Sequence, residues 1–269
     1  MAKSRNPFIY GGAIPSSRFV GRKRQVNRVL ERLTSDAPGN FAIGGERLIG
    51  KTSFLNYVEH EGTAVAKDQL LFVSLDCQSI GTFTPTRFWK RVLKLLSKKV
   101  SQEELKKAVN QVYKKGAIVY RDLEGILDET RGLGQKLVLL LDEFEWVLGT
   151  DVEVMETTTV NFLAGFRALL NQMPRAISVV ICTGEPIYEL CPSSAQRGSP
   201  FYNNFIFIWL KEFTEPEARE LMETYLQGTG VTFTEDDKKF AYEVSEGRPY
   251  FLQLACHRLF ERYVEDDGE

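Results

Sequence analysis

Residues 41 to 55 read FAIGGERLIGKTSFL and contain the residue types that bind phosphate. Gly45, Gly50, Lys51 and Thr52 match the pattern G-x-x-x-x-G-K-[ST], between an apolar run and a helix-like segment. The glycines let backbone N–H groups surround phosphate oxygens, Lys51 neutralises the β- and γ-phosphates, and the Thr52 hydroxyl ligates magnesium. We therefore predict a nucleotide-binding phosphate loop (P-loop) formed by Gly45, Glu46, Arg47, Leu48, Ile49, Gly50, Lys51, Thr52 and Ser53.

A second motif supplies acids for hydrolysis. Residues 137 to 143 read LVLLLDE, an apolar run that ends in two carboxylates. Such a run is typical of a strand buried on both faces of a parallel sheet, with its acids at the carboxyl edge. We predict that Asp142 is the magnesium-side acid and that Glu143 polarises the attacking water. The structural alternative is a core strand that ends in two solvated acids.

Five apolar runs alternate with helical patterns, as expected for a parallel sheet covered by helices. We predict an α/β fold, a P-loop NTPase with a mostly parallel five-stranded sheet. The expected strands are Asn40–Gly44, Leu70–Asp76, Leu137–Asp142, Ile177–Thr183 and Phe205–Trp209. Helical spacing is found at Arg24–Leu33, Arg87–Val100 and Val160–Gln172, and Ser101 with Glu104 predicts a capping box for a further helix.

Only helical patterns follow the last strand. Thr214 with Glu217 and Thr234 with Asp237 predict two capped helices, and a third begins after the Gly247–Pro249 turn. We therefore expect two domains: residues 1–211 as the P-loop nucleotide-binding domain with its N-terminal segment, and residues 212–269 as a small all-helical subdomain.

Composition is ordinary for an intracellular enzyme. The chain has 269 residues, 43% hydrophobic and 26% charged, and a net charge of −2. No stretch approaches the roughly 18 apolar residues of a membrane span, and the N-terminus lacks a signal-peptide apolar core. We expect a cytoplasmic protein with no membrane partner. Four scattered cysteines without C-x-x-C and two histidines indicate neither a zinc site nor a disulfide framework.

Three segments together resemble one family. Residues 19 to 22 read FVGR, the P-loop reads GGERLIGKTSFL, and residues 245 to 256 read SEGRPYFLQLAC. They resemble the signatures of STAND-class P-loop NTPases, the signal-transducing relatives of AAA+ proteins, over about residues 7 to 264. The first segment departs from the family at Lys23, where relatives have an acid, and the P-loop departs at Leu48, where they have arginine. The resemblance implies that the adenine pocket is lined by Phe19, Val20, Gly21 and Arg22.

The resemblance also implies a mechanism. The helical subdomain acts as a lid whose Pro249 approaches the base, Thr183 matches the sensor of the γ-phosphate, and Arg197 lies where AAA+ relatives place an arginine finger. ADP, ATP and Mg²⁺ are the implied ligands. ADP holds a closed monomer, ATP frees the lid and favours homo-oligomers, and slow hydrolysis resets a signalling or defence switch that works with an unidentified sensor or effector protein or domain. The structural alternatives are a strand-end hydroxyl for Thr183 and a solvated charge for Arg197.

Two other functions stay open. An AAA+ ATPase acting on DNA, as a loader or transposition regulator, shares these motifs. The net charge of −2 and a pI near 5.9 argue against a DNA partner, and we interpret the basic run Lys90, Arg91, Lys94, Lys98 and Lys99 as a solvated face. A nucleotide-binding scaffold with negligible turnover is the other alternative.

Overall fold

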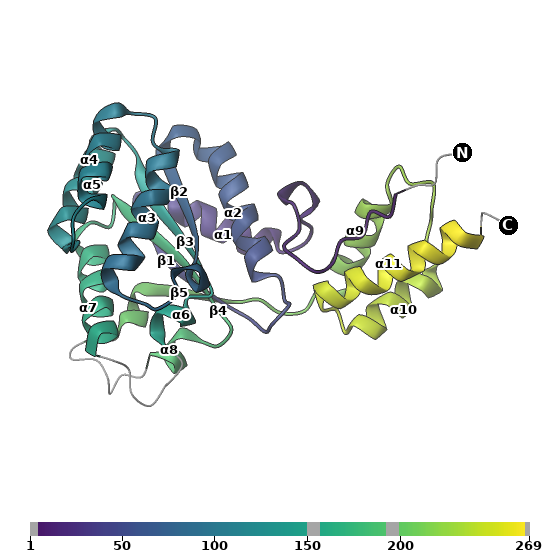
Figure 1. Ribbon diagram of the computed structural model, residues 1–269. Helices are drawn as coiled ribbons and strands as arrows, with labels where there is room; N and C mark the ends of the chain where they lie inside the picture. The colour runs from purple at the N-terminus through teal and green to yellow at the C-terminus, as the bar shows by residue number, and fades with distance from the viewer. Residues whose placement is uncertain (1–4, 150–156, 192–198, 267–269) are drawn as a thin grey trace. The chain divides into compact units, whose positions relative to one another are not determined.

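Five parallel strands form one sheet in the order β2-β3-β4-β1-β5. The computed structural model describes residues 5–149, 157–191 and 199–266, and Figure 1 shows the sheet with its helices. The strands are β1 Asn40–Gly44, β2 Leu70–Asp76, β3 Lys136–Asp142, β4 Ile177–Thr183 and β5 Phe205–Trp209. The predicted α/β fold is confirmed, and β3 begins one residue earlier than expected.

The strand register brings the functional ends together. Gly44 of β1 pairs with Thr183 of β4, and Asp142 of β3 pairs with Asp76 of β2. Because all five strands run in one direction, their carboxyl ends lie along a single edge of the sheet. That edge is where doubly wound folds place their ligands.

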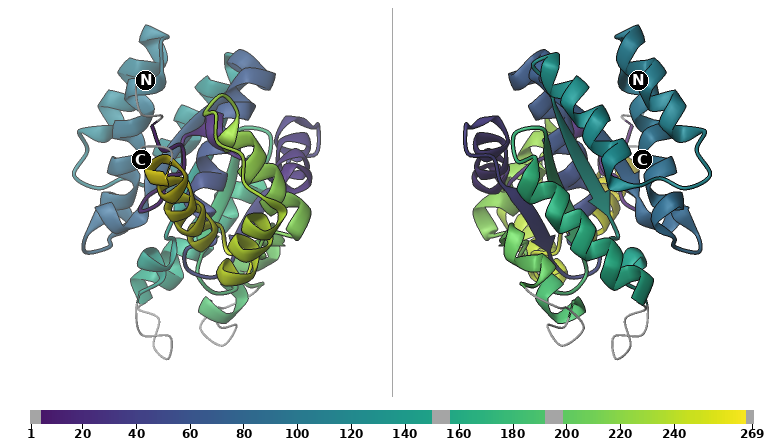
Figure 2. Two further views of the ribbon diagram at one scale, coloured as in Figure 1. Left: turned by 90° about the vertical axis from the view of Figure 1, so that its right-hand side faces the viewer. Right: turned by 90° about the vertical axis from the view of Figure 1, so that its left-hand side faces the viewer.

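Helices cover both faces of the sheet (Figures 1 and 2). Before β5, the described helices are α1 Lys23–Thr34, α2 Lys51–Ala66, α3 Pro85–Lys99, α4 Glu103–Tyr113, α5 Tyr120–Gly132, α6 Glu145–Leu148, α7 Thr157–Gln172 and α8 Ile187–Leu190. The helices α9 Glu215–Leu226, α10 Glu235–Ser245 and α11 Pro249–Asp266 follow β5. One face packs Val73, Leu139 and Val179 against apolar side chains of α3, α5 and α7 in a single buried cluster. On the other face, Gly62 of α2 lies against the ring of Phe72.

Helix starts test the capping predictions. Thr214 and Thr234 begin α9 and α10, and their backbone N–H groups donate to Glu217 and Asp237 at 2.9 and 3.0 Å. The box predicted at Ser101 is wrong, because α4 begins at Glu103 after Gln102, which makes no side-chain cap. Helix α5 was not predicted from the sequence.

The chain divides into two compact units. One contains residues 5–26, 46–57 and 210–266, and the other contains residues 27–45 and 58–209 of the part that the structure describes. The N-terminal segment thus groups with α9, α10 and α11: Phe8 stacks on Tyr225 and Phe233, and the Ile9 N–H donates to Gln253 Oε1 at 3.1 Å. The division at residue 211 stays a prediction. None of the described helices is both long enough and apolar enough to cross a membrane.

Gly165 and Gly125 provide a matched test of packing in the sheet unit. A Cβ at Gly165 would come within 2.1 Å of the Tyr120 ring, whereas a Cβ at Gly125 would meet nothing within 4 Å. We expect Gly165→Ala to lower the free energy of unfolding by about 1–3 kcal/mol through overpacking. Gly125→Ala should raise it by up to about 1 kcal/mol through helix propensity. Urea unfolding measures both, and equal effects would contradict this packing.

Candidate functional site

The P-loop has the backbone shape of an anion cradle. It follows β1 directly, and α2 begins at Lys51. Leu48 and Gly50 have positive φ values of 66° and 92°, and the Ile49 N–H donates to Glu46 O at 3.3 Å. Alternating backbone handedness turns successive N–H groups toward a common centre, which makes a concave site for an anion. The positive end of α2 adds to it.

Lys51 is held over this loop. Lys51 is only 9% exposed, and its Nζ donates a hydrogen bond to Glu46 O at 3.2 Å. A lysine ammonium fixed at the start of a helix, beside converging N–H groups, neutralises phosphate charge without further rearrangement. The predicted phosphate role of Lys51 therefore has a suitable local geometry.

Arg22 ties the loop to the segment that leads into the C-terminal helices. The Arg22 Nη2 donates to Ile49 O at 2.5 Å and to Lys211 O at 3.2 Å, and its guanidinium lies over the Phe213 ring. Burial lowers the pKa of Arg22 to about 10, while Glu217 and Glu212 act in the opposite direction. The group stays charged at neutral pH and is engaged with backbone carbonyls, so it supports the shape of the loop.

Arg248 is a site residue that the sequence reasoning missed. Its Nη2 lies 3.0 Å from Glu46 Oε2, so an ion pair joins the start of α11 to the P-loop. Its position in the SEGRP segment, immediately before Pro249, could have indicated a role in the site, but the family pattern assigns a role only to the proline. Pro249 itself is the first residue of α11.

The other residues assigned to the adenine pocket have structural contacts. Phe19 stacks on Tyr57 with ring centroids 4.2 Å apart, and Val20 is buried in the apolar cluster of α9, α10 and α11. Gly21 has φ 75°, and a Cβ there would come within 3.1 Å of Phe213. These contacts fix the segment beside the P-loop residues of its own unit, and its contact with adenine stays a prediction.

The two acids lie at the carboxyl end of β3, where Asp142 is the last residue of the strand and Glu143 follows it. Glu143 has a left-handed φ of 50°, and its N–H donates to Asp142 Oδ1 at 3.1 Å. Positive φ is costly for a residue with a side chain and is concentrated at functional sites. The next residues anchor the turn: Phe144 N–H donates to Cys182 O, and Glu145 Oε1 accepts from Gly184 N–H at 2.9 Å. Both acids are half-buried, as catalytic carboxylates at a sheet edge would be.

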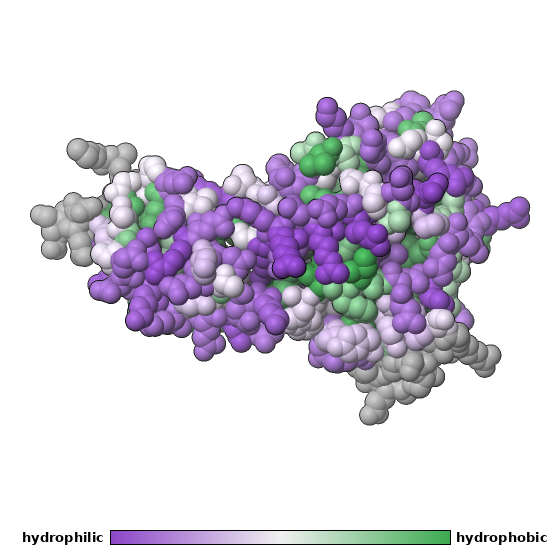
Figure 3. All heavy atoms as spheres, turned by 180° about the vertical axis from the view of Figure 1, so that it is seen from behind, coloured by the Kyte–Doolittle hydropathy of each residue, from purple (hydrophilic) through white to green (hydrophobic). Residues whose placement is uncertain are grey.

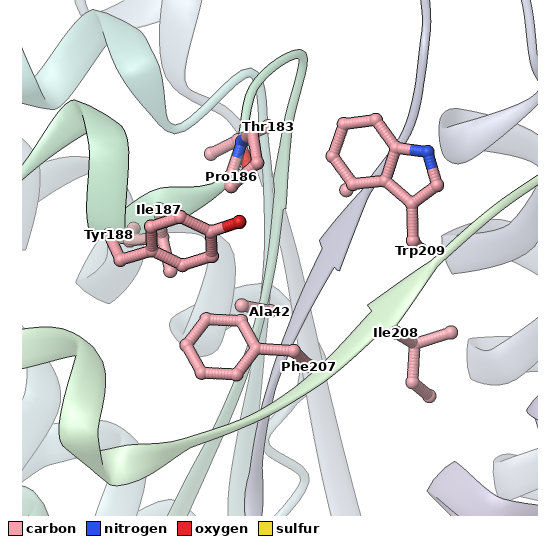
Figure 4. A pocket seen from close by; sticks show the side chains of 9 residues that line it. Ala42, Thr183, Pro186, Ile187, Tyr188, Phe207, Ile208 and Trp209 are labelled. Carbon is pink, nitrogen blue, oxygen red and sulfur yellow. The ribbon is translucent and has the colours of Figure 1, made fainter.

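Thr183 ends β4 and lines a hollow on the outer part of the sheet. Its buried hydroxyl donates to Glu185 O at 2.7 Å. The hollow has a volume of about 340 Å³, and Figure 4 shows Tyr188 facing Phe207, with Trp209 further along β5. The γ-phosphate role of Thr183 stays a prediction. Arg197 lies outside the described residues.

Exposed apolar side chains surround this hollow. Tyr188, Phe207 and Trp209 are 50%, 44% and 42% exposed. Figure 3, which views the molecule from behind, shows hydrophobic residues at the surface among hydrophilic ones.

The donors assigned to magnesium suit that ion. Thr52 offers a hydroxyl oxygen and Asp142 a carboxylate oxygen, and Mg²⁺ takes only one or two carboxylates from proteins with the rest of its shell from phosphates and water. When bound, it would neutralise the negative charge that develops on the phosphates. That Thr52 and Asp142 hold this ion stays a prediction.

The chain has the features of a P-loop ATPase of the AAA+ type: a parallel sheet of this strand order, a P-loop after β1 and a pair of acids at the end of β3. Residues 18–180 match the AAA ATPase domain family, and the chain belongs to that family. No curated protein matches the chain in sequence.

Solved structures with the same fold are distant in sequence. The ORC2 protein of Aeropyrum pernix, in ADPNP–ADP complexes, has a TM-score of 0.67 at 14% identity, over 99% of this chain and 68% of that one. A Walker-type ATPase of Pyrococcus abyssi has 0.62 at 15%, over 92% and 69%. The ORC1 protein of A. pernix with DNA has 0.60 at 16%, over 91% and 61%. The chain therefore spans less than two thirds of the ORC1 protein.

We expect Lys51→Ala to weaken Mg-ATP binding about 100-fold or more, because it removes the charge that balances the β- and γ-phosphates. Isothermal calorimetry measures the affinity, and Lys67→Ala, at an exposed lysine, is the control. Unchanged affinity in Lys51→Ala would show that the loop does not bind phosphate.

We expect Glu143→Gln to keep Mg-ATP bound and to lower turnover by about 100- to 10,000-fold, the range for losing a positioned general base. Phosphate release beside calorimetry separates the two effects. Hydrolysis at the wild-type rate would make Glu143 a structural acid, and negligible turnover in the wild type would favour the scaffold alternative.

Proposed function

We propose that this ATPase is a nucleotide-dependent switch of the STAND type. It binds Mg-ATP, hydrolyses it slowly and couples its nucleotide state to lid opening and homo-oligomer formation in signalling or defence. The lid is formed by α9, α10 and α11. The observation that carries the proposal is the ion pair between Glu46 of the P-loop and Arg248 at the start of α11.

Through this ion pair, nucleotide binding at the P-loop can affect the contacts of the lid. Without nucleotide, the Glu46 carboxylate supplies the negative charge that Arg248 contacts. A phosphate in the loop competes for the same guanidinium, because phosphate oxygens carry more charge and accept bidentate hydrogen bonds. The number of phosphates then changes what holds α11, which is the differential interaction that a ligand-driven switch requires.

The remaining roles complete the cycle. ADP between the P-loop and the lid, with Pro249 beside the adenine, holds a closed monomer, and ATP frees the lid. Glu143 positions the attacking water, and Asp142 and Thr52 hold the magnesium ion. In the oligomer, Arg197 of a neighbouring copy stabilises the charge that develops at the γ-phosphate. An unidentified sensor or effector protein or domain responds to assembly.

We expect Arg248→Ala to speed ADP release about tenfold and to raise the oligomeric fraction at a given ADP concentration. The control is Arg219→Ala, which removes exposed ion pairs to Glu215 and Glu235 within the lid. Stopped flow with a fluorescent ADP and light scattering measure the two effects. Because Glu46 and Arg248 act as a pair, Glu46→Gln should add little in the Arg248→Ala background. Wild-type protein of one size with ADP and with a non-hydrolysable ATP analogue would refute the switch.

An ATPase acting on DNA is the second candidate function. Two solved structures of this fold contain DNA, the A. pernix ORC1 protein and Drosophila ORC, but at 16% and 14% identity they are similar to this chain in fold alone. The observation in this chain that favours the candidate is the clustering of positive charge on α3 and α4.

A further inference from the structure

The α3–α4 hairpin, residues 85–115, concentrates positive charge. It holds ten of the 34 Lys and Arg residues of the chain but only two of the 36 Asp and Glu residues. Its net charge is therefore +8 in a chain of net −2, and the rest of the chain carries −10. The average charge of the molecule conceals a local field that attracts polyanions.

Burial directs this charge outward. Helix α3 buries Phe88, Trp89, Val92, Leu93 and Leu96. At about 100° per residue, the basic positions of α3 fall on the opposite side of the helix, and they are Arg87, Lys90, Arg91, Lys94 and Lys98. Lys107 of α4 and Lys114, the C-cap residue of α4, likewise lie opposite the buried side chains Leu105, Val109 and Val112. Lys90 of α3 lies over the Tyr113 ring of α4, which joins the two helices at this surface.

Most of these charges are not neutralised. Two lysines pair with acids, Lys99 with Glu59 and Lys115 with Asp122. Arg87 and Arg91 donate to neutral oxygens of Thr82 and Ser79, which leaves their charge uncompensated. Within the described part of the chain, no hydrogen bond or ion pair is made by the side-chain ammonium groups of Lys94, Lys98, Lys106, Lys107 and Lys114.

The two acids of the hairpin have a separate explanation. Glu103 and Glu104 occupy the first turn of α4, where negative charge stabilises the helix dipole. Elsewhere the chain has 34 acids that could have screened the lysines. A surface that keeps so many like charges together pays for it in self-repulsion, and a bound polyanion relieves that repulsion.

The shape of the surface selects the polyanion. A single-stranded nucleic acid site needs aromatic platforms for its bases, and membrane insertion needs exposed apolar residues on a basic helix. The only exposed large hydrophobic residue among residues 85–115 is Tyr113, which is already covered by Lys90. We propose that the α3–α4 hairpin binds the phosphate backbone of a nucleic acid duplex without reading its sequence. This inference deepens the second candidate function and does not require the nucleotide switch.

The test compares two variants that each remove four positive charges and bring the net charge to −6. The hairpin variant is Lys94→Gln, Lys98→Gln, Lys107→Gln and Lys114→Gln. The control variant changes exposed basic residues outside the hairpin, and is Arg28→Gln, Lys67→Gln, Arg175→Gln and Lys239→Gln. Fluorescence anisotropy measures binding of the full chain to random DNA and RNA duplexes of about 25 base pairs over a range of salt, since a duplex backbone shows a linear dependence of log affinity on log salt.

We expect the hairpin variant to lose about 30-fold or more in duplex affinity at low salt and to reduce the salt slope by about 3 to 4, one for each phosphate contact removed. The control should lose less than about threefold. The DNA and RNA arms identify which duplex is preferred, and binding to either one supports the proposal. No duplex binding at low salt, equal losses in both variants, or binding only to vesicles of phosphatidylglycerol would overturn it. Calorimetric ATP binding and circular dichroism, unchanged in both variants, separate this result from a failure of the nucleotide site or of folding.

Discussion

The arrangement of the P-loop depends on the hydrogen bonds of the buried Arg22 guanidinium. It donates to Ile49 O in the P-loop and to Lys211 O before α9, and its own backbone N–H donates to Glu217. Burying a cation costs free energy that only good acceptors offset, and removing them would leave an uncompensated charge. Arg22 therefore links the N-terminal turn, the P-loop and the chain that enters α9.

This constraint explains how the compact units divide the sequence. Residues 46–57, which contain most of the P-loop, group with the N-terminal segment and helices α9, α10 and α11, while β1, Asp142 and Glu143 belong to the sheet unit. The residues from Glu46 to Ser53, including Thr52, thus belong to one unit, and Gly45, Asp142 and Glu143 belong to the other.

Much of this architecture is legible in the sequence because local chemistry dictates it. Continuous apolar runs such as LVLLL are typical of strands buried on both faces, and a Thr followed three residues later by an acid indicates the starts of α9 and α10. The capping box predicted at Ser101 is wrong because the N-cap residue of α4 is Gln102, one position later. The sequence pattern alone does not show at which of two neighbouring residues a helix begins. Helix α5 was not predicted, although its buried residues Leu123, Ile126 and Leu127 keep helical spacing; Gly125 within it lowers the helix propensity.

The site shows the same limit. The P-loop and Asp142 follow from motifs, but the contact between Glu46 and Arg248 joins residues 202 positions apart in the sequence, and no spacing rule connects them. The basic run on α3 was visible, yet the whole-chain charge concealed its meaning. Only the buried residues of α3 and α4 show that the basic positions of each helix lie opposite its buried face.

The basic hairpin is also connected to the edge of the sheet that carries the acids. Arg91 of α3 donates to Ser79 Oγ at 3.0 Å, and Ser79 donates to the carbonyl oxygen of Asp76 at 2.6 Å. Asp76 ends β2 and is the register partner of Asp142. A chain of contacts becomes coupling only if both ligands bias the same element between two arrangements. Where they do, linkage makes the effect reciprocal: a duplex on α3 that raises ATP affinity by some factor must be bound more tightly by the ATP form by that same factor. A turnover rate carries no such symmetry. The affinity for each ligand in the presence of the other therefore decides whether the ATPase site and the basic hairpin are coupled.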